Sequence, residues 1–147
     1  MVRNRLMNRL TYLGWAFGVL LAARGAWAAE DGKAALAAMA AEGQKLFTSE
    51  SFGGSGTCET CHLEGGRAPG KLPDGRPIPS LIGAAAHFPR YAPRRGQVVT
   101  LTTQIANCIK GALHGTPPAY DSREMTALET YLASLAKGTV MGSQFGP

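Results

Sequence analysis

Apolar positions repeat at helical spacing in three parts of the chain. Residues 31–48 are rich in alanine and place their larger apolar side chains at roughly helical intervals, which predicts a first helix. In residues 98–112 the apolar positions fall three and four residues apart and therefore share one face: Val98, Leu101, Ile105, Cys108, Ile109 and Ala112. This second pattern predicts a helix with Cys108 on its buried side.

The third predicted helix has signals at both ends. Asp121 or Ser122 can cap its first turn, with Glu124 close behind, and Gly138 ends it. Its apolar stripe consists of Met125, Leu128, Leu132 and Leu135. No stretch alternates between apolar and polar residues as a half-buried strand does. The pattern as a whole predicts an all-α fold.

Glycine and proline crowd the region between the first two helices, residues 49–95. Such a composition excludes long regular elements. Loops of this length in compact domains are usually functional or disordered. This one contains Cys58, Cys61 and His62 in the spacing Cys-x-x-Cys-His, which makes it the first place to look for chemistry.

The N-terminus has the pattern of an export signal. Three arginines precede a short apolar run at residues 13–23, and Ala26-Trp27-Ala28 fits the small-x-small cleavage rule. We therefore expect residues 1–28 to be a secretory signal peptide and residues 29–147 to form one mature domain in the periplasm. The run is too short to cross a bilayer, so we expect no membrane span after cleavage. An uncleaved anchor is the alternative.

Charge follows the same division. The formal net charge of the chain is +5. Without the four arginines of the signal segment it falls to about +1, so the basic balance belongs to the signal. A nucleic-acid partner is not expected, because nothing in the mature chain forms a clustered basic face. A domain of this small size would gain much of its core from a bound prosthetic group.

The Cys-x-x-Cys-His spacing favours haem over its two competitors. Two thiols three residues apart can add to the two vinyl groups of one haem, and the adjacent histidine is then placed to bind the iron. A zinc site would need further ligands, and the chain has no second cysteine pair or closely spaced histidine pair. A redox disulfide would sit at a helix start in a βαβ unit, which the pattern does not show. One covalent haem c is the expected cofactor.

These features resemble the class I c-type cytochromes, with "EGQKLF" before the motif and "SREMTALETYLASLAKG" as the closing helix. The resemblance covers most of residues 40–138. It implies three to five helices wrapped around one covalent haem with long Gly/Pro-rich loops. It also implies that Cys58 and Cys61 are the thioether attachments and His62 the proximal ligand. Pro79 resembles the family's proline, whose carbonyl accepts a hydrogen bond from the histidine Nδ1, although it could be only a turn proline.

Four residues compete to be the distal ligand: Cys108, His114, Met125 and Met141. Met125 lies on a core stripe, His114 ends the second helix, and Met141 follows the third. Cys108 is the odd thiol of an exported chain, and such a thiol is expected to pair or react. We predict that Cys108 is the iron ligand and the candidate catalytic residue, with a small buried hydrophobe as the alternative reading.

The segment "HFPRYAPRRGQVVTLTTQIANCIKGALHG" is similar to the region of the distal cysteine in the Cys-ligated haem domains of SoxA and thiosulfate dehydrogenase. The similarity implies that Cys108 ligates the haem and takes part in sulfur chemistry. Two features depart from it. Gln104 stands where those families tend to carry arginine, and one haem motif is present where thiosulfate dehydrogenases carry two. Four basic residues could supply the missing positive charge for an anion such as thiosulfate: Arg90, Arg94, Arg95 and Lys110. The alternative is that they are solvated loop residues.

The expected function is that of a periplasmic monohaem cytochrome with His/Cys ligation, which transfers electrons in the oxidation of thiosulfate or related sulfur compounds. One alternative is an enzyme subunit of the SoxA or thiosulfate dehydrogenase type that acts on thiosulfate at the Cys-ligated haem. Another is an ordinary electron-transfer cytochrome with a His/Met or His/His haem. The expected partners are a redox protein or a catalytic subunit, with a small sulfur anion as a further candidate.

Overall fold

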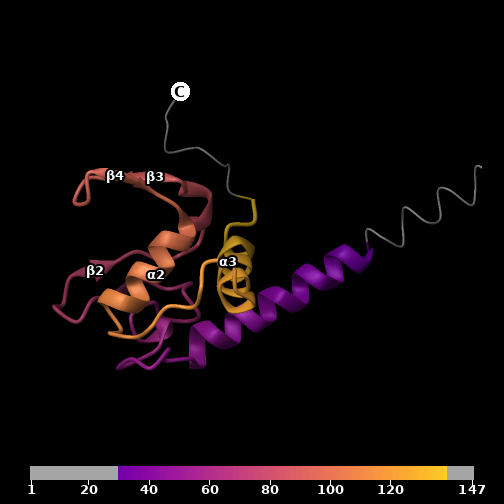
Figure 1. Ribbon diagram of the computed structural model, residues 1–147, viewed down its shortest axis with the longest axis horizontal. Helices are drawn as coiled ribbons and strands as arrows, with labels where there is room; N and C mark the ends of the chain where they lie inside the picture. Colours follow the sequence, from indigo (N-terminus) through magenta and orange to yellow (C-terminus); the bar gives the residue numbers. More distant parts are fainter. Residues whose placement is uncertain (1–29, 139–147) are drawn as a thin grey trace, which may run out of the picture. The chain divides into compact units, whose positions relative to one another are not determined.

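The structure is a computed structural model that describes residues 30–138 (Figure 1). The predicted signal peptide, residues 1–28, and the candidate ligand Met141 lie outside the described residues. The chain divides into two units, residues 1–37 and 38–147. The described part of the first unit is helical, and the fold below is that of the second.

Helices account for most of the regular structure in the part of the chain that is described. The first helix, α1, covers residues 30–49. The elements that follow, in chain order, are η1 (Cys58–Thr60), β1 (Gly70–Lys71), β2 (Pro77–Ile78), η2 (Ala84–His87), β3 (Arg90–Ala92), β4 (Gln97–Val99), α2 (Leu101–Gly111) and α3 (Arg123–Leu135). The predicted helical framework is therefore present, with short elements between its first and second helices (Figure 1).

The expectation of a purely helical chain needs one correction. Two small antiparallel hairpins lie within the Gly/Pro-rich region, one that pairs β1 with β2 and one that pairs β3 with β4. Their strands are two or three residues long, so no alternating pattern can appear in the sequence. The turns contain Gly75 and Gly96, whose positive φ angles of 84° and 65° suit glycine.

The second helix begins three residues later than its apolar spacing predicts. Thr100 is the N-cap, and its side chain accepts a hydrogen bond from the Thr103 backbone N–H at 3.1 Å. Val98 therefore belongs to β4, where it is 66% exposed, and does not share the buried face of α2. Its neighbour Val99 is buried instead.

The core lies where α1, α2 and α3 meet. The predicted cap of α3 is confirmed, because the Ser122 side chain accepts from the Met125 backbone N–H at 3.2 Å. Most of the predicted stripe of α3 is buried, and Leu135 is partly buried against the same cluster. The buried cluster consists of Phe47, Ile105, Ala106, Ile109, Leu113, Met125, Leu128, Tyr131 and Leu132.

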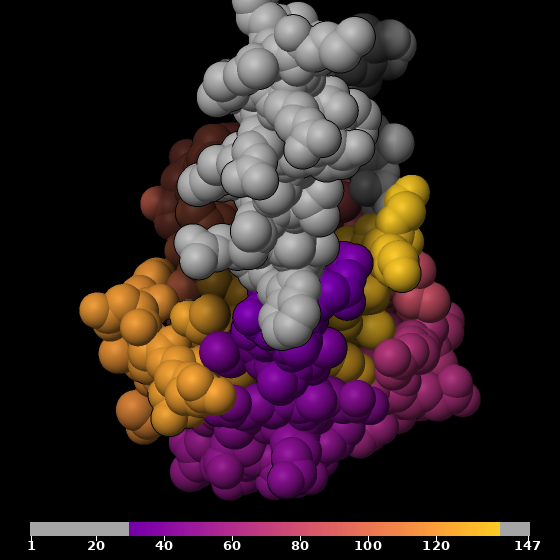
Figure 2. Space-filling view, turned by 90° about the vertical axis from the view of Figure 1, so that its right-hand side faces the viewer, coloured from indigo at the N-terminus to yellow at the C-terminus, as the bar shows by residue number. Residues whose placement is uncertain are grey.

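Gly43 allows the backbones of α1 and α3 to approach closely. A Cβ atom at Gly43 would overlap the Ala127 carbonyl oxygen and would lie 2.8 Å from the Tyr131 Cβ. Nearby, Arg123 pairs with Glu42 at 2.6 Å on the surface. In Figure 2 the purple atoms beyond residue 38 lie between the segment that joins α2 to α3 (orange) and the chain that follows the Cys-x-x-Cys-His motif (pink).

No helix within residues 30–138 is both long enough and apolar enough to span a membrane.

Candidate functional site

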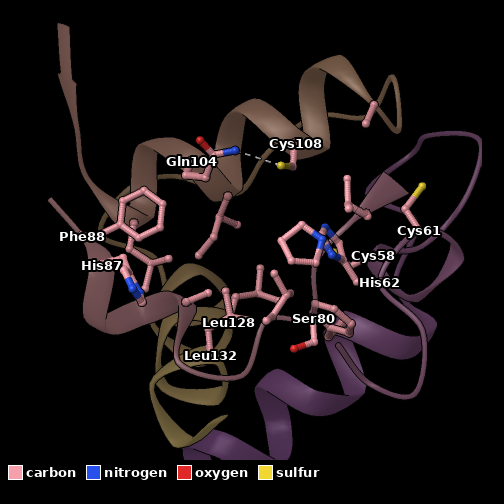
Figure 3. Close-up of a pocket in the computed structure, with 18 of the residues that line it drawn as sticks. Cys58, Cys61, His62, Ser80, His87, Phe88, Gln104, Cys108, Leu128 and Leu132 are labelled. Atoms are coloured by element: carbon pink, nitrogen blue, oxygen red, sulfur yellow. Dashed lines mark hydrogen bonds between the residues drawn. The ribbon is translucent and has the colours of Figure 1, made fainter. Parts of the chain in front are cut away.

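One cavity of about 610 Å³ brings the predicted chemistry together (Figure 3). Its walls come from the Gly/Pro-rich region, from α2 and α3, and from Phe47 of α1, and most of its lining is apolar. The predicted site residues Cys58, Cys61, His62, Pro79 and Cys108 all line it. The volume lies in the range of small-molecule and cofactor pockets.

The motif is held at the cavity by hydrogen bonds to its own loop and to α3. The His62 backbone N–H donates to the Cys58 carbonyl at 3.0 Å, which closes the turn around the two thiols. Gly65 is held from two sides, because its N–H donates to Glu59 Oε1 at 2.9 Å and its carbonyl accepts from the Tyr131 hydroxyl at 2.6 Å. A buried side chain of α3 thus fixes the loop that carries the motif.

A second set of contacts joins the loop before the motif to the end of α2. The Ser55 backbone N–H donates to the Leu113 carbonyl at 2.7 Å, and the Thr116 N–H donates to the Phe52 carbonyl at 2.8 Å. Gly54 packs so close to the Leu113 carbonyl that a Cβ atom would overlap its oxygen. We call residues 52–55 and 113–116 the backbone clamp. It links the segment that leads into Cys58 with the helix that carries Cys108.

All three cysteines are free thiols. Burial first, and the neighbouring Cys108 second, raise the pKa of the Cys58 thiol to about 12. Cys58 is therefore protonated at neutral pH, whereas the attacking cysteine of a redox disulfide has a lowered pKa. No group of three or more His, Cys, Asp or Glu side chains within residues 30–138 could hold a metal by itself. Neither competitor of haem is supported by the geometry.

His62 has the protonation state that a metal ligand requires. It is partly buried, and burial lowers its pKa, so the imidazole is neutral at pH 7. The ring packs against Phe47, with 6.3 Å between ring centroids. Its Nδ1 atom is buried and has no hydrogen-bond partner. A buried nitrogen without a partner is costly and rare, so this atom is a site where a hydrogen-bonding group or ligand is expected.

The predicted hydrogen bond from His62 Nδ1 to the Pro79 carbonyl is not formed in this structure. Pro79 follows β2 and lines the cavity, but it is largely exposed. The ring of His62 is held by its packing on Phe47 rather than by a hydrogen bond. Pro79 thus lines the same cavity as His62, but the hydrogen bond that the resemblance implied between them is absent.

Of the distal-ligand candidates within the described residues, Cys108 alone lines the cavity. It lies on α2, and Gln104 Nε2 donates to its Sγ at 3.3 Å (Figure 3). His114 follows α2 with a φ of 58°, is exposed and does not line the cavity. Met125 is fully buried in the core cluster and does not line it either.

His87 is a cavity residue that the sequence pattern did not single out. It ends η2, and its Nδ1 lies 3.0 Å from the Gly83 carbonyl oxygen. Of the four cations considered for an anion, Arg90 lines the cavity, and the others are exposed outside it. The sequence "HFP" and the arginines that follow it could have indicated a site here, but their spacing does not show which of these side chains face the cavity.

The helical fold and the cysteine-histidine cavity define a c-type cytochrome domain. The sequence profile of one family, described as "SoxA/TsdA, cytochrome c domain", matches residues 42–141, more than half of the chain. The chain belongs to this SoxA/TsdA cytochrome c family.

The relatives carry thiosulfate dehydrogenase names. The chain is 31% identical over 98 residues to "Thiosulfate dehydrogenase" of Stutzerimonas stutzeri, a match that covers 67% of the chain and 30% of that protein. It is 28% identical over 93 residues to the protein of the same name from Allochromatium vinosum, covering 63% and 33%. A solved thiosulfate dehydrogenase (TsdBA) from Marichromatium purpuratum matches with a TM-score of 0.58 and 25% identity, over 73% of this chain and 24% of that one. The chain thus matches no more than about a third of each of these relatives' length.

The residues present fit the haem c that a cytochrome c domain implies. Cys58 and Cys61 would attach it, and the neutral imidazole of His62 and the sulfur of Cys108 are donors suited to iron. The cavity between them is apolar, as a planar aromatic cofactor requires.

Proposed function

We propose that this chain is a periplasmic monohaem c-type cytochrome that transfers electrons in the oxidation of thiosulfate or a related sulfur compound. In this proposal Cys58 and Cys61 attach the haem, His62 is the proximal ligand and Cys108 the distal ligand. The observation that carries the ligand assignment is the location of Cys108 in the same cavity as the motif, while His114 and Met125 lie elsewhere.

The bound haem supplies a one-electron couple between ferric and ferrous iron. The chain's own residues set the conditions for it. Leu128 and Leu132 contribute apolar surface that excludes water, which favours the less charged state. His62 supplies a neutral donor, and Gln104 holds the sulfur of Cys108. A thiolate donor is expected to lower the reduction potential relative to a His/Met pair.

The number of electrons that the oxidation releases favours an electron carrier over a complete enzyme. Joining two thiosulfate ions into tetrathionate forms one S–S bond and releases two electrons. A chain with one haem accepts one electron at a time, so each turnover needs two such chains or a partner that takes the first electron. The sequence contains one Cys-x-x-Cys-His motif, at Cys58, Cys61 and His62.

A catalytic subunit of the SoxA or thiosulfate dehydrogenase type is the second candidate. It is favoured by the names of the relatives and by Arg90 at the cavity, which could attract an anion. Gln104 weighs against it, because this neutral amide lies beside Cys108, where the resembling families tend to carry a cation. We therefore prefer the carrier, with a redox protein or a catalytic subunit as its partner.

A Cys108→Met variant tests the ligand assignment. The native ferric protein should give the EPR and electronic spectra of a thiolate-ligated low-spin haem. The variant supplies a neutral thioether on a longer side chain that can extend into the cavity, so its potential should rise by on the order of 0.1 V, within the roughly 0.8 V that axial ligands span. Met125→Leu is the control, since that side chain is core packing and should leave both spectrum and potential unchanged. A native spectrum without thiolate features would refute His/Cys ligation.

Turnover separates the two candidates. Thiosulfate is supplied with an artificial electron acceptor, and tetrathionate is measured. Formation of tetrathionate that is lost in Cys108→Ala would support the catalytic subunit. A thiolate-ligated haem that is reduced by a partner but forms no tetrathionate would support the carrier.

Mass analysis of the protein from the periplasmic fraction tests cleavage after Ala28.

A further inference from the structure

The cavity has two chemically different ends (Figure 3). Cys58, Cys61 and His62 lie at one end, and His87 with Phe88 lies at the other. Arg90 also lines the cavity, and its guanidinium carbon lies 5.1 Å from the centroid of the Phe88 ring. One end therefore carries the two thiols of the motif, and the other carries a histidine and an arginine.

Arg90 is held in place without a carboxylate partner. Its contact with Phe88 is a cation–π interaction, which orients the guanidinium but does not neutralise it. The ion pairs within residues 30–138 involve other arginines and a lysine, and none includes Arg90. Arg90 pairs with Val99 in the β3–β4 hairpin, so its backbone has a fixed position next to the cavity.

His87 offers one free ring nitrogen at the same end. The Gly83 carbonyl can only accept, so the Nδ1 atom 3.0 Å away carries the proton and donates. This fixes the ring and leaves Nε2 without a partner among the described residues. Toward a carboxyl group, Nε2 can accept from the acid or, once protonated, donate to the carboxylate.

Haem has a matching asymmetry. Its two vinyl groups, to which the thiols add, and its two propionate groups lie toward opposite edges of the porphyrin. A cofactor attached through Cys58 and Cys61 at one end of the cavity therefore directs its propionates toward the other end. A carboxylate at the edge of an apolar cavity is stabilised by a charged or hydrogen-bonding partner.

We propose that His87 and Arg90 form the site that binds the haem propionates. This inference rests on the proposed single covalent haem and adds the residues that hold its charged edge. Removal of the Arg90 cation would leave a propionate charge uncompensated, which stabilises ferric iron and lowers the reduction potential. The β3–β4 hairpin is then part of the cofactor site.

The test uses the haem-loaded chain and matched substitutions on one hairpin. Arg90→Gln and Arg94→Gln remove the same charge, but only Arg90 lines the cavity. Arg90→Gln should lower the reduction potential, and both Arg90→Gln and His87→Leu should shift the propionate bending band in the resonance Raman spectrum. Arg94→Gln should change neither, because a more distant exposed charge is screened by salt. Arg90→Lys should restore most of the potential, since it keeps the cation.

A second measurement compares the binding affinities of free haem and of haem dimethyl ester for the Cys58→Ala/Cys61→Ala double variant, which cannot attach either one covalently. With Arg90 present, free haem should bind more tightly than the ester by about five-fold, as expected for an exposed ion pair, and Arg90→Gln should abolish the difference. Equal potentials and Raman spectra in the Arg90, His87 and Arg94 variants would overturn the propionate site alone. Absence of covalent haem from the native chain would overturn the proposed function and this inference with it.

Discussion

Gln104 lies one helical turn before Cys108, and its amide donates to the cysteine sulfur at 3.3 Å. Both residues are on α2, so this contact depends on the helix itself more than on distant packing. A hydrogen bond to a ligating sulfur withdraws electron density from it and so tunes the potential of the metal. Gln104 therefore offers the sulfur of Cys108 a neutral hydrogen-bond donor.

We expect Gln104→Leu to lower the reduction potential of the haem-loaded chain. The change keeps similar bulk but removes the donor, so the sulfur donates more strongly and stabilises ferric iron. The free energy involved should be about 1 kcal/mol, that of a typical hydrogen bond. Gln97→Leu is the matched control, because Gln97 is exposed on β4 and does not line the cavity. Equal potentials in the two variants, measured by redox titration, would contradict a role for Gln104.

Tyr131 is the residue of α3 that holds the motif loop. Its hydroxyl donates to the Gly65 carbonyl at 2.6 Å and accepts from Arg67 at 3.3 Å. Tyr131→Phe should reduce the free energy of unfolding by about 1–3 kcal/mol, because a buried carbonyl loses its donor. Tyr120→Phe should have no measurable effect, since Tyr120 is 62% exposed. Denaturant unfolding of both variants checks this, and similar values for the two would argue against the anchoring role.

Among the elements, the contact between α1 and α3 depends on a missing side chain. Gly43 lies inside α1, where glycine is intrinsically unfavourable, yet a Cβ atom there would overlap the Ala127 carbonyl. The glycine is therefore explained by packing and not by helix formation. Phe47, one turn later, then reaches both Tyr131 and His62, with ring centroids at 5.4 and 6.3 Å.

Two glycine-to-alanine changes in α1 should affect the stability of the protein differently. Gly43→Ala gains about 1 kcal/mol of helix propensity but incurs overpacking of about 1–3 kcal/mol against backbone atoms. We expect a net loss of stability of up to about 2 kcal/mol. Gly32→Ala meets no atom within 4 Å, so it should leave the melting temperature unchanged or raise it. Thermal unfolding of the two variants measures this, and stabilisation by Gly43→Ala would mean that the helices are not in close contact.

The sequence predicted elements well where periodicity runs over several turns. The existence of all three helices and the inward position of Cys108 followed from apolar spacing, and the Ser122 cap followed from the polar residues that precede α3. The hairpins did not, because strands of two or three residues are too short to show a period. The early start assigned to α2 failed because apolar Val98 precedes the Thr100 cap. His87 and Arg90 were unpredictable as a pair, since a hairpin and a 3-10 turn bring them to one cavity.

For the whole molecule, the cavity implies that the cofactor is part of the core. A space of about 610 Å³ lies against the buried cluster, and Leu128, Leu132 and Leu113 belong to both. A small domain that leaves such a volume unfilled loses contacts along the entire lining. Loading with haem and stability of the fold are therefore coupled.

We expect Cys58→Ala/Cys61→Ala to abolish haem staining on a denaturing gel and to lower the melting temperature by at least ~10 °C, equivalent to about 2 kcal/mol. The reason is that both thioether bonds are lost and the cofactor can dissociate. Cys108→Ala is the control, since it removes a sulfur but no attachment and should keep the stain. Staining that survives the double substitution would refute covalent attachment through these residues.

The backbone clamp limits how the distal side can move. Residues 52–55 and 113–116 are bonded through main-chain atoms, with Leu113 itself buried in the core cluster. A rigid movement of α2 would therefore also move the loop that leads into the Cys-x-x-Cys-His motif, so that Cys108 and His62 would shift together. If Cys108 binds the iron as proposed, its release to an incoming sulfur anion would then occur through rotation of its own side chain or through unwinding of one helical turn. Ligand exchange at an iron bound by Cys108 would thus be a local motion of α2, and its rate should respond to substitutions on α2 far more than to changes in the β3–β4 hairpin.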